Sequence, residues 1–272
     1  MNPSTLGAAA TVAYLAATFA LIKSLSSDFI LTRSSPWQRL RILGLGWVAA
    51  LFHGGSLSEM CDGAGTVNFS FLSVSSLSAL SIVLILLLAS LGRPVDKLGV
   101  IIFPLAGLIV LLKLALPDEM HALKTHSWQM NVHILTSMLA YSFLNIAALQ
   151  AILVAFQDWH LRTHHASSLV RSLPPLQTME TMLFQLIGTG FVLLSLSLLS
   201  GFIFLEDLFA QHLAHKTVLS ILAWLVFAVL IGGRVWQGWR GQVAIRWTLG
   251  GFIALMLAYF GSKMVLEWVL HR

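Results

Sequence analysis

Long apolar runs alternate with short polar connections along the whole chain. A membrane-spanning helix needs ~20 mostly apolar residues. Eight runs come close to that length, over about residues 5–23, 40–57, 69–91, 98–116, 130–156, 180–204, 217–233 and 246–269. This pattern predicts an all-α fold: a polytopic membrane helix bundle of eight transmembrane helices, forming a single transmembrane domain over residues 1–272.

Composition supports a membrane protein and excludes several other classes. Of the 272 residues, 57% are hydrophobic and 10% charged, and the mean hydropathy is +0.85. The net charge of +5 is spread between the apolar runs, so it does not indicate a nucleic-acid partner. No basic segment precedes the first run, so we expect an uncleaved membrane anchor. A lone cysteine, Cys61, excludes an intrachain disulfide, a zinc site made of thiolates and a CxxCH haem-attachment motif.

The basic residues predict the orientation of the bundle. Alternate connections and their edges hold Lys23, Arg33, Arg39, Arg41, Arg93, Lys97, Arg162, Arg171, Arg234, Arg240 and Arg246. The other side holds Lys113, Lys124, Lys216, Lys263 and Arg272, together with most of the acidic residues. Since cytoplasmic loops are rich in lysine and arginine, we expect both termini on the outer side of a bacterial inner membrane.

Histidines give the chain its candidate chemistry. His160, His164 and His165 fall on the predicted cytoplasmic side, where a solvated basic loop explains them. On the outer side, His53, His133 and His215 lie at the ends of runs two, five and seven, at a similar predicted depth. His215 closes a connection that also carries Glu206, Asp207, His212 and, next to it, Lys216.

Ionisable residues inside a membrane are candidates for function. Neutral imidazole is a common axial ligand of haem iron, so two such histidines on different helices would suit a b-type haem. The alternative is that each histidine only hydrogen-bonds a neighbouring helix. Carboxylates are scarce within the runs, and no HExxH, P-loop or GxSxG motif is present, so the sequence does not predict an enzyme.

The second half of the chain resembles a known family. The segments NVHILTSMLAYSFLNIAALQAIL, HKTVLSILAWLVFAVLIGGR and GWRGQVAIRWTLGGFIALMLAYFGSK are similar to the cytochrome c assembly, haem-handling membrane proteins, in their smaller CcsA-like or HemX-like branch. The resemblance covers residues 129–263 well and the first hundred residues loosely. It implies haem b at the outer face, with His133 matching the first external histidine of the family.

One segment departs from the family pattern. Relatives that present haem to apocytochrome c carry a tryptophan-rich signature in the connection before run seven. Here that connection reads GFIFLEDLFAQHLAHKT, and no tryptophan lies between Trp159 and Trp224.

The sequence therefore predicts an inner-membrane haem-handling protein related to cytochrome c assembly factors. Its partners would be the lipid bilayer and other membrane or cytochrome-assembly proteins. His133 and His215 are the predicted axial ligands of the haem iron, with His53 as the alternate, and Lys216 or Lys113 would pair with haem propionates. One alternative is a membrane scaffold or accessory subunit without haem. A transporter for a small solute or ion is less favoured, because paired carboxylates, inverted repeats and broken helices are absent from the pattern.

Overall fold

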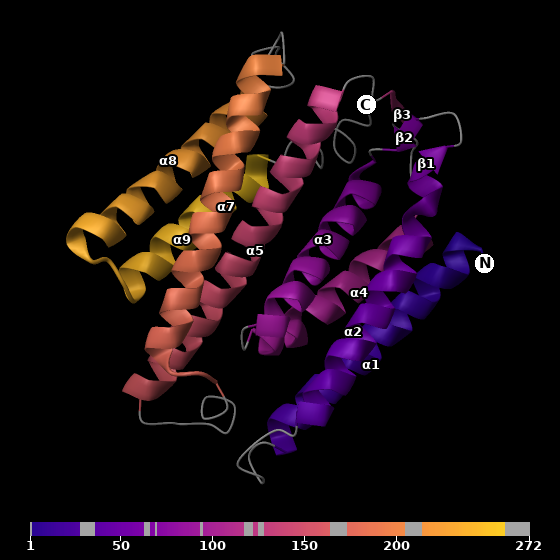
Figure 1. The fold of residues 1–272 in the computed structure, drawn as a ribbon, viewed down its shortest axis with the longest axis horizontal. Coiled ribbons are helices and arrows are strands. Elements are labelled where there is room, and N and C mark those ends of the chain that lie inside the picture. The colour runs from indigo at the N-terminus through magenta and orange to yellow at the C-terminus, as the bar shows by residue number, and fades with distance from the viewer. Residues whose placement is uncertain are drawn as a thin grey trace. The chain divides into compact units, whose positions relative to one another are not determined.

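The chain folds into a set of long helices (Figure 1). The computed structural model describes residues 2–27, 36–62, 66–68, 70–92, 95–116, 122–124, 128–163, 173–204 and 214–258. Eight α-helices lie within these ranges: α1 Pro3–Ser27, α2 Pro36–Ser56, α3 Phe71–Gly92, α4 Gly99–Ala115, α5 Trp128–Arg162, α7 Leu176–Phe204, α8 Ala214–Gln237 and α9 Gln242–Met256.

Each predicted run corresponds to one of these helices. Six of them, α1, α3, α4, α5, α7 and α8, are long and apolar enough to cross a membrane. Of the other two, α2 carries Arg39 and Arg41 near its start, and α9 has 15 residues. The part of the eighth run after residue 258 lies outside the described residues. The prediction of a polytopic membrane helix bundle is confirmed, and the count of eight spans stays a prediction.

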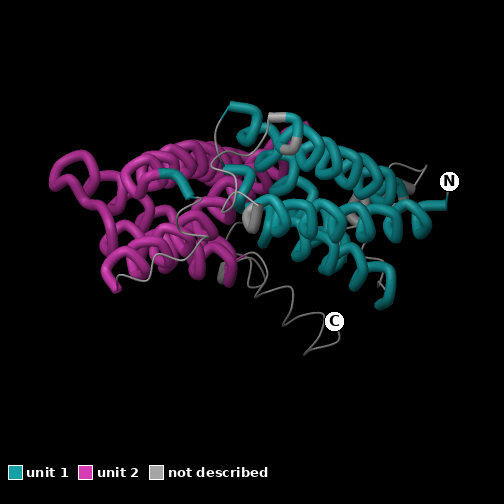
Figure 2. The backbone as a smooth tube through the Cα atoms, turned by 90° about the horizontal axis from the view of Figure 1, so that it is seen from below, with its two compact units in different colours: residues 1–125, 164–174 teal, residues 126–163, 175–272 magenta. Residues whose placement is uncertain are grey.

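The described residues group into two compact units (Figure 2). Unit 1 contains residues 1–125 and 164–174, and unit 2 contains residues 126–163 and 175–272. The predicted single transmembrane domain over 1–272 stays a prediction, because grouping by contacts does not show whether either unit folds alone.

Unit 1 is a ring of four helices around an apolar core. α1 packs against α2 and α4, and α3 packs against the same two helices. Tyr14 of α1 and Phe103 of α4 are fully buried and stack with ring centroids 6.0 Å apart. Gly107 lies beside Tyr14, where an added Cβ would be 3.4 Å from the tyrosine Cβ, so a small residue allows α1 and α4 to approach closely.

A small antiparallel sheet joins two connections of unit 1, the one between α2 and α3 and the one after α4. Its strands are β1 Cys61–Asp62, β2 Thr66–Asn68 and β3 Ala122–Lys124, in the order β1-β2-β3. Val67 pairs with Cys61 on one side and with Leu123 on the other. The all-α prediction did not include this sheet, because strands of two or three residues leave no readable alternation in the sequence.

Unit 2 is a second ring, in which α7 packs against α5 and α8 while α9 packs against the same two helices. Close approach of α5 and α7 depends on Gly190, where a Cβ would meet the Leu144 side chain at 2.7 Å. At one end of this pair, Trp128 of α5 meets Phe204 of α7 edge-on, with centroids 6.1 Å apart. Since α5 has 35 residues, it is about 52 Å long and exceeds the ~30 Å hydrocarbon core of a bilayer.

Polar side chains fix the turn between α8 and α9. Gly238 and Gly241 adopt φ angles of 67° and 59°, a region that favours glycine. The backbone N–H of Gly241 donates to the Glu180 carboxylate at 2.8 Å. Asp158 is buried and accepts hydrogen bonds from Gln242 at 2.9 Å and from Arg162 at 3.0 Å. These bonds tie the turn to α5 and α7 at the end where the sequence predicts the cytoplasm.

Candidate functional site

His133 projects from the second turn of α5 and contacts the last turns of α7. Its Nδ1 atom lies 3.0 Å from the backbone carbonyl oxygen of Ser197 and 3.0 Å from the hydroxyl oxygen of Ser200. The two serines are three residues apart and therefore share one face of α7. The imidazole is half-buried, so it is held on one side by α7 without being enclosed.

These contacts determine which nitrogen of His133 carries the proton. A carbonyl oxygen can only accept, so Nδ1 donates to Ser197. The Ser200 hydroxyl itself donates to the same carbonyl at 2.8 Å, which leaves the Ser200 oxygen as a second acceptor for the Nδ1 proton. In the neutral imidazole, the lone pair therefore sits on Nε2. Among the described residues, none forms a hydrogen bond with Nε2.

This arrangement is the one expected of a metal-binding histidine. Ligating imidazoles usually donate their second ring N–H to a carbonyl, a carboxylate or water, which orients the ring and increases its basicity. The Ser197 carbonyl and Ser200 hydroxyl supply that support to His133. The residues around His133 thus fit an iron ligand at Nε2.

His215 lies in the first turn of α8, at the same end of unit 2. α7 and α8 are antiparallel and are held by the Trp224 indole N–H, which donates to Ser195 at 2.8 Å, and by stacking of Trp224 on Phe191. Counting along both helices at 1.5 Å per residue places the His215 backbone about 6 Å beyond the level of Ser200. The side chain of His215 and the residues Glu206, Asp207 and His212 lie outside the described part of the chain.

Lys216 is the neighbour of His215 in α8 and is partly buried. Lys113, the other candidate for a propionate contact, is in the last turn of α4 in unit 1. α7 packs against both α5 and α8, and His133, His215 and Lys216 all belong to unit 2.

His53 is in unit 1 and has a different environment. It is completely buried, with Nδ1 3.1 Å from the Tyr14 hydroxyl and Nε2 2.9 Å from the Ser76 hydroxyl. Each hydroxyl can donate or accept, so either tautomer of His53 engages both ring nitrogens. For His53 to bind iron, one of these two hydrogen bonds would have to break.

The sequence did not predict the hydrogen-bond partners of the two histidines. These partners are Ser197 and Ser200 for His133, and Tyr14 and Ser76 for His53. Serines are numerous in runs three and six, and the sequence pattern does not distinguish a serine that bonds a histidine from one that only packs between helices. The i, i+3 spacing of Ser197 and Ser200 was a readable signal, but nothing in the sequence paired it with His133. Within the described ranges, no three histidine, cysteine or acidic side chains come together as a metal site.

Comparison with known proteins identifies relatives over most of the chain. The profile of the family described as "Cytochrome C assembly protein" matches residues 42–270. The inner membrane protein YpjD of Escherichia coli K12 is 33% identical over 247 residues, which is 88% of this chain and 91% of YpjD. The cytochrome c biogenesis protein CcsA of Guillardia theta is 28% identical, over 62% of this chain and 64% of that protein. No solved structure matches.

These matches confirm the resemblance that the sequence showed in its second half and extend it into the first half. They also agree with a multi-pass membrane protein, as the six apolar helices indicate. The chain belongs to the cytochrome c assembly protein family.

Proposed function

We propose that this chain is a haem-handling protein of the bacterial inner membrane, which binds a b-type haem near the outer face through histidines. Its family supports a role related to cytochrome c biogenesis, since several relatives carry that description. His133 is the proposed first axial ligand and His215 the second, while His53 is the alternate ligand. The outer location rests on the distribution of basic residues.

The contact between His133 and α7 is the observation that carries this proposal. The Ser197 carbonyl and the Ser200 hydroxyl keep the proton on Nδ1 and leave Nε2 with a lone pair. His53 ranks below His133 because both of its ring nitrogens already have hydrogen-bond partners. Lys216, next to His215, would pair with a propionate at the interface.

A bound haem would supply a redox-active iron. The protein residues would orient that group: His133 would hold the iron, and the α7 serines hold the ring of His133. The proposal includes no covalent chemistry by the protein.

An absorbance spectrum tests the proposal. The protein would be expressed with ample haem, purified in mild detergent and scanned for a Soret band and for the α and β bands of the reduced form. We expect a b-type spectrum that His133→Ala abolishes. Absence of any Soret band in the native protein would overturn the haem proposal.

His160→Ala is a matched control for His133→Ala. His160 lies on the same helix, and its Nδ1 also contacts a backbone carbonyl, that of Phe156, at 3.0 Å. It is at the opposite end of α5, so its loss should leave the spectrum unchanged. If His160→Ala removes the haem and His133→Ala does not, the site is at the other end of unit 2.

A scaffold or accessory subunit without haem is the second candidate. The missing tryptophans between Trp159 and Trp224 favour it, and so does the fully hydrogen-bonded His53. In that case the protein would purify with a stoichiometric membrane partner and without haem, and His133→Ala would reduce the free energy of unfolding only.

A further inference from the structure

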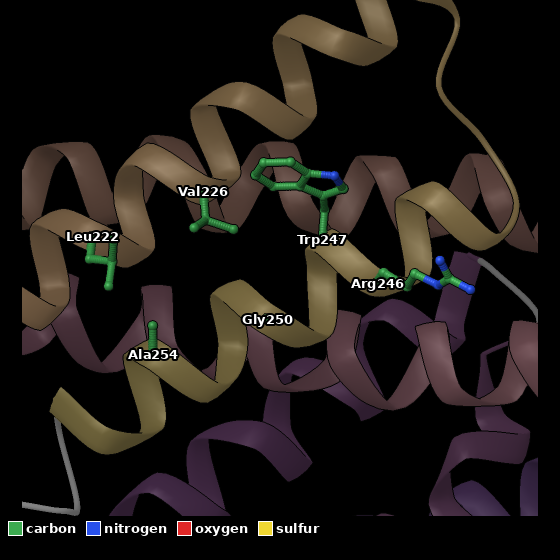
Figure 3. Close-up of a pocket in the computed structure, with 6 residues that line it drawn as sticks. All are labelled: Leu222, Val226, Arg246, Trp247, Gly250 and Ala254. Atoms are coloured by element: carbon green, nitrogen blue, oxygen red, sulfur yellow. The ribbon is translucent and has the colours of Figure 1, made fainter.

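An apolar groove runs between α8 and α9 within unit 2 (Figure 3). It has a volume of about 350 Å³ and is lined by Leu222 and Val226 of α8 and by Arg246, Trp247, Gly250 and Ala254 of α9. From Arg246 to Ala254 the α9 side of the groove extends over about 12 Å. The groove is thus long, narrow and open along its length.

Gly250 makes the groove possible. A Cβ added at this position would meet no atom within 4 Å, so the space beside the helix is open. The next residue, Gly251, faces a different side of α9 and is tightly packed, because a Cβ there would be 2.9 Å from the Phe227 ring. The adjacent glycines therefore have different roles: Gly251 lets α8 and α9 pack, and Gly250 leaves room on the outer surface.

The polar end of the groove carries a cation. Figure 3 shows Arg246 at the end opposite Leu222 and Ala254, with Trp247 next to Val226. Arg246 is exposed and forms no hydrogen bond or ion pair with any described residue. Arg234, by contrast, donates to the Trp239 carbonyl at 3.0 Å and lies over the Phe184 ring. Arg246 is therefore available for an anion from outside the protein.

We infer that this groove binds one anionic phospholipid, with an acyl chain along Leu222, Val226, Gly250 and Ala254 and the phosphate beside Arg246. The apolar lining fits the hydrocarbon chain of a lipid, since the groove lies between two helices of a membrane protein. Basic residues between transmembrane helices on the cytoplasmic side are a recurring binding place for anionic headgroups. In this arrangement, Trp247 would lie where the acyl chain meets the lipid headgroup, a position that suits its amphipathic ring. The inference is independent of haem binding.

Quenching of Trp247 fluorescence tests the inference directly. The full-length protein would be reconstituted in vesicles that contain phosphatidylglycerol or phosphatidylcholine with brominated acyl chains, and the Trp247→Phe variant would give the contribution of the other tryptophans. We expect the Trp247 contribution to be quenched several-fold more by the brominated anionic lipid at equal mole fraction. Equal quenching by the two lipids would overturn the inference, since it shows an ordinary boundary lipid.

Two variants with matched controls separate the headgroup from the acyl chain. Arg246→Gln should remove the preference for the anionic lipid, whereas Arg240→Gln, in the turn before α9 and outside the groove, should preserve it. Gly250→Leu should fill the groove and reduce quenching by both lipids. Gly188→Leu is its control, because a Cβ at Gly188 of α7 also meets nothing within 4 Å. Equal loss from Arg246→Gln and Arg240→Gln would mean general surface charge and no site.

Discussion

The Nδ1 atom of His133 lies 3.0 Å from the carbonyl oxygen of Ser197, across the contact between α5 and α7. A carbonyl accepts hydrogen bonds only, so this contact assigns the proton of the neutral imidazole to Nδ1. The Ser200 hydroxyl reinforces the assignment, since it donates to the same carbonyl and accepts from the same nitrogen.

Ser200→Ala should weaken haem binding without abolishing it. The Ser197 carbonyl remains as an acceptor, while the second acceptor and its orienting effect on the ring are lost. Loss of such a supporting group typically reduces metal affinity about 10-fold or more. Haem retention would be measured by titration of apoprotein with haem and by the midpoint potential. Thr189→Ala is the control, because Thr189 of α7 bonds only its own helix at Gln185. An unchanged affinity in Ser200→Ala would argue against the proposed role of His133.

His53 should prove structural. His53→Ala removes a fully buried side chain and strands the hydroxyls of Tyr14 and Ser76, so we expect a loss of about 3 kcal/mol in the free energy of unfolding. Tyr14→Phe and Ser76→Ala each break one bond and should cost about 1 kcal/mol. Unfolding in detergent, followed by circular dichroism, measures these losses. A Soret band that disappears in Tyr14→Phe would instead connect the His53 network to haem.

Replacing each of two glycines of α7 by alanine should change the stability of the protein in opposite directions. Gly190→Ala places a methyl group 2.7 Å from Leu144 Cγ, and overpacking of this kind costs about 1–3 kcal/mol. Gly188→Ala meets open space, and replacement of glycine in a helix stabilises it by about 1 kcal/mol. The free energy of unfolding, measured in the same detergent, should therefore fall in Gly190→Ala and rise in Gly188→Ala. Equal shifts would contradict the close packing of α5 against α7.

The predicted orientation can be tested with single cysteines in a Cys61→Ser background. Ser4→Cys at the start of α1 should react with a membrane-impermeant maleimide in intact spheroplasts. Thr163→Cys, just after α5, should react only after lysis, since basic residues place it in the cytoplasm. Both positions are exposed, so access differs by side and not by burial. The reverse pattern of labelling would invert the topology and move His133 to the cytoplasmic side.

The apolar runs by themselves determined the class of this protein. A bilayer requires every spanning segment to satisfy its own backbone hydrogen bonds, so runs of ~20 apolar residues predict helices before any tertiary contact is known. The segments around His133, His215 and Arg246 were also enough to show the family. The sequence could not show the three-stranded sheet, because its pairing of Val67 with Leu123 joins residues far apart in the chain through backbone atoms.

The tertiary structure alone decided how the histidines differ. By position in the sequence, His53 and His133 were both polar residues at the ends of apolar runs, and only the family resemblance ranked His133 first. Packing of α1, α2 and α3 gives His53 a hydroxyl at each nitrogen, whereas α7 gives His133 acceptors at one nitrogen only. Likewise, the neighbours Gly250 and Gly251 differ only in which side of α9 meets Phe227. Such distinctions depend on which helix faces lie together, and periodicity along one helix does not encode its partner.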